Sequence, residues 1–285
     1  ESTAHLRFDP ALAGGFWSFP FPSDLRTVAG HPDFSGFPNP GNSQLLQEYV
    51  DYSGATLDGF GTNAPIWLTF DGPVVVPEWS GDAAQAAMGC EGPILLVDVS
   101  AGSPHRGECL PVRWHLTDPG DPDPFEAPNQ LAVAPYWGFP MRSASTYAVL
   151  VSGLTDPNGA HVASPGALRD ALQGEGEPSL VATLAPLAAL IAERPQLVLG
   201  EAPGEEARWV AAASVFTTQE VIEPMRRLAA FVRDEPGLPV WSGELAMLEE
   251  DSEHFAGSYD IWDGAYSAWN FQEGEIPYAQ TGGGF

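Results

Sequence analysis

The stretch that decides the fold is GPILLVDVSAGSPHRGECLPVRWHL, residues 92–116. Within it, residues 94–99 form an apolar run broken only by Asp98, which is the pattern of a buried strand. Residues 110–116 are again rich in strand-forming side chains, and the connection at 100–107 holds the Gly, Ser and Pro residues typical of turns. We therefore predict that the two strands pair as a hairpin.

Two cysteines flank this hairpin, and the chain has no others. Cys90 precedes the first strand and Cys109 opens the second, so a bond between them would pin the open end of the hairpin to its neighbour. A redox role is disfavoured because no C-x-x-C spacing occurs. We predict a structural disulfide between Cys90 and Cys109, which fits an oxidising compartment.

The rest of the chain extends the β pattern and adds helices. Further strands are expected at residues 64–70, 130–135, 146–151 and 208–216, and helices at 43–52, 179–193 and 219–233. Pro186 should kink or split the second helix, and Thr218 is the expected N-cap of the third. The predicted fold class is mostly β with α insertions: an Ig-like β-sandwich with an extended N-terminal arm and a small helical segment.

Three segments follow from composition along the chain. Residues 1–88 hold a proline-rich, aromatic arm, expected to lie pinned across a folded body, and the first strands packed on the sandwich. Residues 89–235 are the predicted sandwich, with its helical insertion at about 165–235. Residues 236–285 are turn-rich and aromatic, and we expect them to lead to a downstream domain that is missing here.

The charge balance excludes several partners. The chain has 38 acidic and 11 basic residues, all of the latter Arg, for a net charge of −27. Such a chain is repelled by nucleic acid and by anionic membranes. It also lacks an apolar run near the roughly 20 residues that span a bilayer. The charge either keeps an exported protein soluble or attracts cations such as calcium. We expect an extracellular or cell-surface protein whose signal segment has already been removed.

The motifs that announce common enzyme classes are missing from the sequence. It contains no G-x-S-x-G elbow, no P-loop, no dinucleotide fingerprint and no H-E-x-x-H pair. Ser-x-x-Lys chemistry is excluded because the chain has no Lys. Carboxylates are plentiful, but no pair stands out as the two acids of a glycosidase.

Two segments remain as candidate binding sites. Carboxylates at Asp118, Asp121, Asp123 and Glu126 lie in a Pro-rich loop, where they form either a calcium site or a solvated connection. Near the C-terminus, Trp262, Tyr266 and Trp269 form either a stacking platform for a polymer or a surface that packs on another domain.

A family resemblance covers residues 15–235 approximately. FPFPSDLR (19–26), HPDFSGFPNP (31–40), LDGFGTNAPIWLTFDGPV (57–74) and PILLVDV (93–99) resemble the N-terminal region of large secreted or surface-anchored bacterial α/β-hydrolases of the virulence-factor lipase kind. The segments 131–172 and 210–219 resemble the bacterial Ig-like module often found there. In such proteins the hydrolase domain follows this region, so the resemblance implies that the catalytic domain is absent.

The predicted function is that of a non-catalytic accessory or positioning region of an extracellular, lipase- or esterase-like hydrolase. Its expected partner is a downstream hydrolase domain or a separate chain, with surface assembly as a further role. Two alternatives stay open: a calcium-dependent surface adhesion or assembly protein, and a self-contained secreted hydrolase that uses carboxylates.

Overall fold

The structure is a computed structural model of the 285-residue chain. It describes residues 4–78, 88–117, 123–198, 209–234, 240–241, 246–247 and 262–267. Contacts divide the chain into two compact units, residues 1–220 and 221–285. The division of the sequence at residues 88 and 235 stays a prediction.

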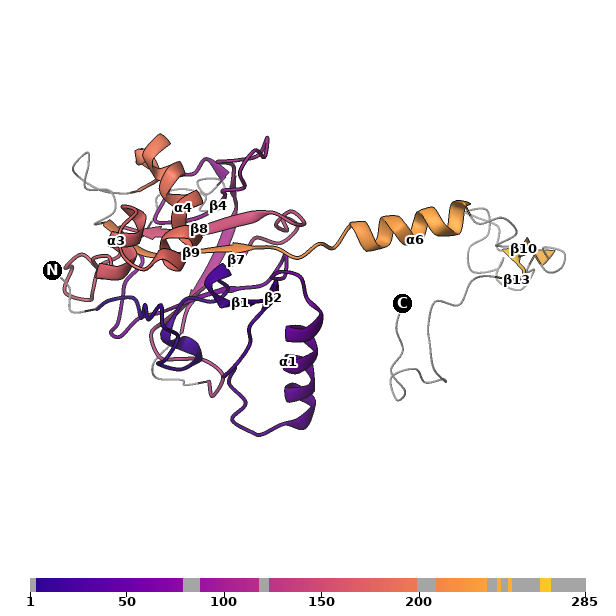
Figure 1. Cartoon of the computed structure of the whole chain (residues 1–285), viewed down its shortest axis with the longest axis horizontal. Helices are drawn as coiled ribbons and strands as arrows, with labels where there is room; N and C mark the ends of the chain where they lie inside the picture. The colour runs from indigo at the N-terminus through magenta and orange to yellow at the C-terminus, as the bar shows by residue number, and fades with distance from the viewer. Residues whose placement is uncertain are drawn as a thin grey trace. The chain divides into compact units, whose positions relative to one another are not determined.

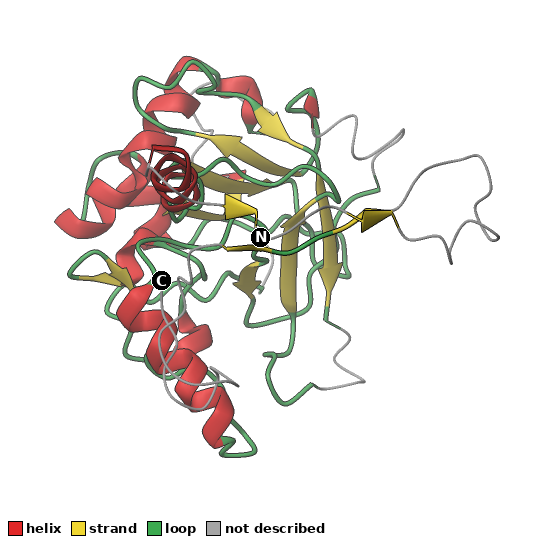
Figure 2. Ribbon diagram, turned by 90° about the vertical axis from the view of Figure 1, so that its right-hand side faces the viewer, coloured by secondary structure: helices red, strands yellow, loops and turns green. Residues whose placement is uncertain are grey.

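Two antiparallel sheets form the centre of the first unit (Figures 1 and 2). The four-stranded sheet has the order β5 (Cys109–Leu110), β4 (Ile94–Asp98), β8 (Thr146–Ser152), β9 (Val210–Thr217). The three-stranded sheet has the order β3 (Ile66–Thr69), β7 (Gln130–Pro135), β6 (Val112–Leu116). Both sheets contribute to one hydrophobic core. The predicted β-rich fold with helical insertions is confirmed.

Helices cover the four-stranded sheet. Strands β4 and β8 are buried along almost their whole length, as is β9, because α3 (Gly166–Leu172) and α4 (Pro178–Glu193) pack on this sheet at β9 (Figure 1). The face of α4 toward the core carries Leu180, Leu184, Leu187, Leu190 and Ile191. The helix predicted over residues 179–193 is confirmed, and Pro186 does not split it.

The predicted hairpin partner of β4 changes sheets. Only Cys109 and Leu110 pair with β4, opposite Val97 and Leu96, whereas residues 112–116 pair with β7 in the other sheet. Pro111 lies at the crossing, where its missing N–H ends the first ladder. The hairpin prediction was therefore right for two residues and wrong for the rest of the strand.

The N-terminal arm is part of the core, as the sequence predicted. Phe16, Phe19 and Phe21 are buried, and Phe21 exchanges two backbone hydrogen bonds with Trp67 of β3. The short elements of this region are η1 (Phe16–Ser18), η2 (Asp24–Arg26), β1 (Thr27–Val28), β2 (His31–Pro32) and α1 (Gln44–Thr56). The 3-10 turn η3 (Pro195–Leu197) follows α4.

The second unit holds α6 (Glu223–Asp234) and two short antiparallel pairs. Strand β10 (Val240–Trp241) pairs with β13 (Tyr266–Ser267), and β11 (Ala246–Met247) pairs with β12 (Trp262–Asp263). No residue of α6 is buried. The helix predicted over residues 219–233 is therefore present over most of that range, without any buried residue. None of the helices in the described ranges is both long and apolar enough to cross a bilayer.

The predicted N-cap of α6 was wrong. Thr218 directly follows β9 and is buried. Its hydroxyl donates to the carbonyl of Arg142 at 2.6 Å and accepts the N–H of Ser145 at 2.9 Å. This residue therefore fixes the β8 and β9 ends together, and the helix begins several residues later at Glu223.

Candidate interaction site

A groove of about 520 Å³ lies between α1 and the segment that contains β2 in the first unit. The residues that line it are Val28, His31, Pro32, Asp33, Phe34, Ser35, Gly36, Phe37, Gln47, Val50, Asp51 and Gly54. One wall is therefore the end of the N-terminal arm, and the other is one face of a helix.

The start of α1 is fixed by local hydrogen bonds. Ser43 is its N-cap, and the Ser43 hydroxyl accepts the N–H of Leu46 at 3.3 Å. Asn39 holds the cap in place, since its side chain accepts the N–H of Ser43 at 2.8 Å and donates to the Ser43 carbonyl at 3.0 Å. The helix predicted over residues 43–52 is confirmed, with a serine at the N-cap position that favours this residue type.

The end of α1 is where the helix meets the arm. A Cβ at Gly54 would lie 3.6 Å from the carbonyl oxygen of Pro32 and 3.8 Å from the ring of Phe34. The carbonyl of Leu57 accepts a hydrogen bond of 2.8 Å from Nδ1 of His31. Because a carbonyl only accepts, Nδ1 of His31 is the donor in this hydrogen bond. Phe34 also packs on the buried Phe21, with centroids 5.6 Å apart, so the groove wall is continuous with the core.

Carboxylates from both walls give the groove an acidic lining. Asp33 comes from the arm and Asp51 from α1. Hydrogen bonding to Ser35 lowers the pKa of Asp33, and the charge of Arg26 adds to this effect. Arg26 is itself buried, which lowers its pKa, and it donates to the Phe16 carbonyl at 2.6 Å. The groove therefore favours a cationic group over an anionic one.

The other face of α1 is exposed and apolar. Leu45, Tyr49 and Tyr52 are 61%, 63% and 69% exposed. Their spacing of four and three residues places them on one face of the helix. No residue of α1 is buried, and Figure 1 shows the helix at the margin of its unit. A capped helix that buries nothing has a surface suited to a partner rather than to the core. We call Leu45, Tyr49 and Tyr52 the α1 stripe.

The α1 stripe and the groove use opposite faces of one helix. Gln47, Val50, Asp51 and Gly54 line the groove. With 100° per residue, these four positions centre about 180° from the stripe. One helix therefore has an acidic, partly covered face and an apolar, uncovered face.

The histidines do not form a catalytic arrangement in the described part of the chain. His105 contacts Glu108 at 3.1 Å, His5 lies 3.9 Å from Asp71, and His31 faces a carbonyl. Within those residues no imidazole ring is hydrogen-bonded to a Ser, Thr or Cys side chain, so the pairing of nucleophile and base is missing there.

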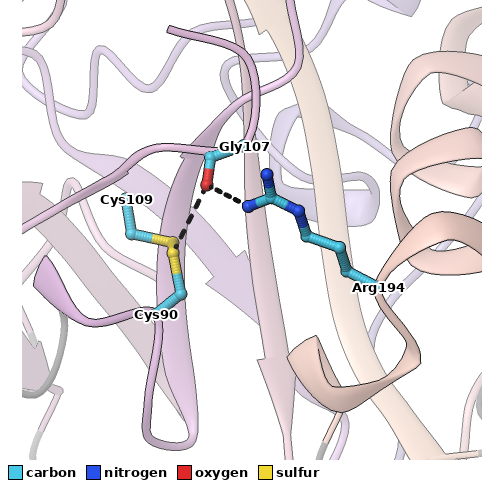
Figure 3. Close-up of a disulfide and its surroundings, with 4 residues drawn as sticks. All are labelled: Cys90, Gly107, Cys109 and Arg194. Atoms are coloured by element: carbon cyan, nitrogen blue, oxygen red, sulfur yellow. Dashed lines mark hydrogen bonds between the residues drawn. A yellow bond between two sulfur atoms is a disulfide. The ribbon is translucent and has the colours of Figure 1, made fainter.

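The disulfide Cys90–Cys109 is confirmed (Figure 3). The Cα atoms are 5.3 Å apart, and the sequence separation is 19 residues. The carbonyl of Gly107 accepts a hydrogen bond of 2.9 Å from Nη1 of Arg194 and lies 3.6 Å from the Cys90 sulfur. Since a bridged sulfur has no hydrogen, the latter is a contact only. The disulfide joins the segment before β4 to β5, and Arg194 attaches the β4–β5 connection to the end of α4.

A cluster of charged side chains also stabilises the β4–β5 connection. Asp98 is fully buried, and its Oδ1 accepts the N–H of Ser100 at 2.8 Å. Its Oδ2 lies 3.8 Å from Nη1 of Arg142, whose Nη2 donates to Glu108 at 2.9 Å. Hydrogen bonding to His105 lowers the pKa of Glu108, with Arg142 contributing less. This cluster ties three segments of the sheet edge together, and the sequence gave no signal for it beyond the buried Asp98.

The predicted calcium loop is described in part. Asp118 and Asp121 lie outside the described residues. Asp123 accepts the N–H of Phe125 at 2.8 Å, and Glu126 accepts the hydroxyl of Thr117 at 3.0 Å. Among the described residues, no group of three His, Cys, Asp or Glu side chains is arranged to hold a metal ion. The two described carboxylates act as local turn and loop caps, and calcium binding stays a prediction.

The predicted aromatic platform is also described in part. Trp262 in β12 and Tyr266 in β13 are 57% and 61% exposed, whereas Trp269 lies outside the described residues. Both described side chains are available at the surface of the second unit, and the role predicted for them is untested. The α1 stripe was not predicted, although the i, i+4, i+7 spacing of Leu45, Tyr49 and Tyr52 could have indicated it.

Comparison with known proteins assigns no family. No family model matches the chain, and no curated protein does. Two solved structures were found: the S-layer protein rSbsC(31-844), at 17% identity and a TM-score of 0.21, and the N-terminal part of the bacterial S-layer protein SbsC, at 18% and 0.21. Each match covers 43% of this chain but only 15% and 26% of the S-layer chains. Likeness at this TM-score carries no argument about fold or function.

Proposed function

We propose that this chain is a non-catalytic interaction and positioning module of an extracellular or cell-surface hydrolase of the lipase or esterase kind. The observation that carries the proposal is the α1 stripe: a well-capped helix with no buried residue that exposes Leu45, Tyr49 and Tyr52. Exposed tyrosines on a rigid helix provide contact area at low cost in conformational entropy.

Two further observations support this role. The rings of His5 and His105 face carboxylates, that of His31 faces a carbonyl, and that of His161 packs on Trp209. The disulfide Cys90–Cys109 is typical of exported proteins. The partner is the hydrolase domain itself, in the same polypeptide or in a separate chain.

The immunoglobulin-like assignment belongs to the same proposal. A four-stranded and a three-stranded antiparallel sheet with a common core are what the constant-type immunoglobulin sandwich contains. The helices α3 and α4 lie between β8 and β9 in sequence, so they would be an insertion before the last strand of that sandwich.

The first experiment measures hydrolysis of a soluble p-nitrophenyl ester by residues 1–285. The expected result is the rate of the buffer alone. Saturable turnover that follows the protein through purification would overturn the proposal.

The second experiment uses the hydrolase that the same gene or its operon encodes. The variant Tyr49→Ser/Tyr52→Ser should leave kcat/KM on a soluble ester unchanged and lower activity on an emulsified ester. The matched control is Tyr136→Ser, which removes an exposed tyrosine (43%) from another part of the unit. Equal activities of the double variant and the control on both substrates would contradict a positioning role for α1.

A further inference from the structure

In the described part of the chain, the edge strands of the two sheets differ in how far other segments cover them. The outer edge of β3 is covered by the arm: Phe21 and Trp67 exchange hydrogen bonds of 3.1 and 2.6 Å, and Arg7 donates to Thr69 at 2.7 Å. Uncovered edges invite pairing with other chains, so proteins normally protect them.

The four-stranded sheet protects its edges as well. Seven of the eight residues of the edge strand β9 are buried. At its end the Phe60 N–H donates to the Thr217 carbonyl at 2.9 Å, and the Phe60 carbonyl accepts from Gln219 at 2.8 Å. The opposite edge is β5, which is only two residues long. Short edge strands are a common protection.

Strand β6 is the exception. It is five residues long and, in the described part of the chain, pairs on one side only, with β7. The Pro111 carbonyl accepts the N–H of Tyr136, and Thr117 donates to Gln130, both at 2.8 Å. Antiparallel pairs alternate, so Arg113 and His115 also bond toward β7. The backbone N–H and C=O groups of Val112, Trp114 and Leu116 therefore point to the open edge.

The side chains of β6 add a cation and an aromatic ring to this open edge. Arg113, Trp114 and His115 are all exposed, Trp114 by 46%. The Arg113 guanidinium carbon lies 4.0 Å from the ring centroid of Trp137, an arrangement that orients the cation. Among the described residues no carboxylate forms an ion pair with Arg113, although the chain has 38 acids against 11 Arg.

We propose that the open edge of β6 binds an extended polypeptide segment in which acidic and apolar residues alternate, and that this segment is added to the three-stranded sheet as a fourth strand. Directly opposite residues of paired strands share a face. Acidic residues of the added strand would lie beside Arg113 and His115, in the pairs where side chains approach most closely. Apolar residues would lie beside Trp114 on the other face.

A second copy of this chain fits the edge poorly. An antiparallel β6–β6 pair centred on Trp114 would place Arg113 opposite His115 of the other copy, without any acid. This binding site does not depend on the hydrolase role proposed for α1.

The test measures fluorescence anisotropy of a labelled peptide in which valine and glutamate alternate, titrated with the full chain. The decisive comparison is Trp114→Pro against Trp114→Val. Both remove the indole, but only proline removes the N–H that points to the open edge, and the ladder to β7 is untouched. We expect saturable binding that Trp114→Val retains and that Trp114→Pro weakens by about tenfold, the loss of one or two backbone hydrogen bonds.

A charge comparison tests the identity of the occupant. The wild-type chain should prefer the valine–glutamate peptide to the same peptide with lysine in place of glutamate, and Arg113→Gln should remove much of that preference. Thermal unfolding checks that each variant folds. If Trp114→Pro does not fold, the comparison of Leu116→Pro with Leu116→Val replaces the comparison at Trp114. The proposal is overturned if the wild type binds neither peptide, if proline and valine variants bind equally, or if sedimentation shows a dimer that only the proline variant breaks.

Discussion

The disulfide is the single covalent constraint on the edge of the four-stranded sheet, and its contribution can be measured. Replacing both cysteines, Cys90→Ser with Cys109→Ser, should lower the free energy of unfolding in urea by about 3 kcal/mol, because a loop of about 20 residues is no longer closed in the unfolded chain. Dithiothreitol should produce the same loss in the wild type and no change in the double variant. A double variant as stable as the oxidised wild type would contradict this expectation.

The Asp33 carboxylate should make the free energy of unfolding depend on pH. Its pKa is lowered in the folded state, first by hydrogen bonding to Ser35. A carboxylate with a lowered pKa stabilises the fold above its unfolded pKa, ordinarily 3.8, and this contribution is lost as pH falls through the folded pKa. The wild type should therefore exceed Asp33→Asn in urea stability at pH 6, with the difference shrinking below pH 4 or so. A difference that stays constant between pH 6 and pH 3 would count against it.

At the level of single residues, the sequence predicted the disulfide correctly but did not predict the groove or the open edge of β6. Cys90 and Cys109 were paired correctly because the chain offers no other cysteine. The groove was not predicted, because it depends on Gly54 meeting Pro32 and Phe34, a long-range contact that no local pattern encodes. The open edge of β6 was missed for the same kind of reason.

Two glycines, Gly54 in the last turn of α1 and Gly59 just after the helix, should respond to alanine in opposite ways. A Cβ at Gly59 would lie 2.6 Å from the backbone nitrogen of Gln219 and 2.7 Å from the carbonyl carbon of Thr218. Gly59→Ala should therefore destabilise the fold by about 2 kcal/mol or more, since backbone must move. Gly54 lies within α1, and a Cβ there would meet Pro32 and Phe34 only at ordinary contact distances of 3.6 and 3.8 Å. Gly54→Ala should therefore stabilise by about 0.5–1 kcal/mol through helix propensity.

Urea unfolding of both variants beside the wild type measures this pair. The opposite signs matter more than the sizes, because Gly59→Ala reports on the close backbone packing beside Phe60 at the β9 edge, whereas Gly54→Ala reports on helix propensity at the end of α1. If Gly59→Ala were neutral, the close approach of residues 59 and 219 would be wrong.

At the level of elements, the prediction from sequence succeeded where periodicity is local. The strands β4, β7 and β8 and the helix α4 lie where the pattern placed them. Pro111 shows the limit: the strand-forming residues on both sides were recognised, but the change of sheet at the residue without an N–H was not. For α6 the helical period was right, whereas burial depends on a partner that periodicity does not reveal.

The whole molecule is organised around a core that belongs to one unit. Every residue of the described hydrophobic core lies between Ala4 and Phe216, and the second unit begins at Val221. Removing residues 221–285 takes away none of these core residues. The shortened chain should fold cooperatively, with a Tm within about 4 °C of the full chain, which corresponds to about 1 kcal/mol for a domain of this size.

Deletion of the N-terminal residues 1–22 is the comparison for deletion of residues 221–285. Removing residues 1–22 is the smaller cut, yet it removes Phe16, Phe19 and Phe21, which are 5%, 3% and 9% exposed. Each buried phenylalanine contributes about 1.5–3 kcal/mol, and their sum is comparable with the whole stability of a typical domain, about 5–15 kcal/mol. Circular dichroism melts should therefore show a cooperative transition for residues 1–220 and none for residues 23–285. The reverse result would mean that the arm is an appendage and that the core depends on the second unit.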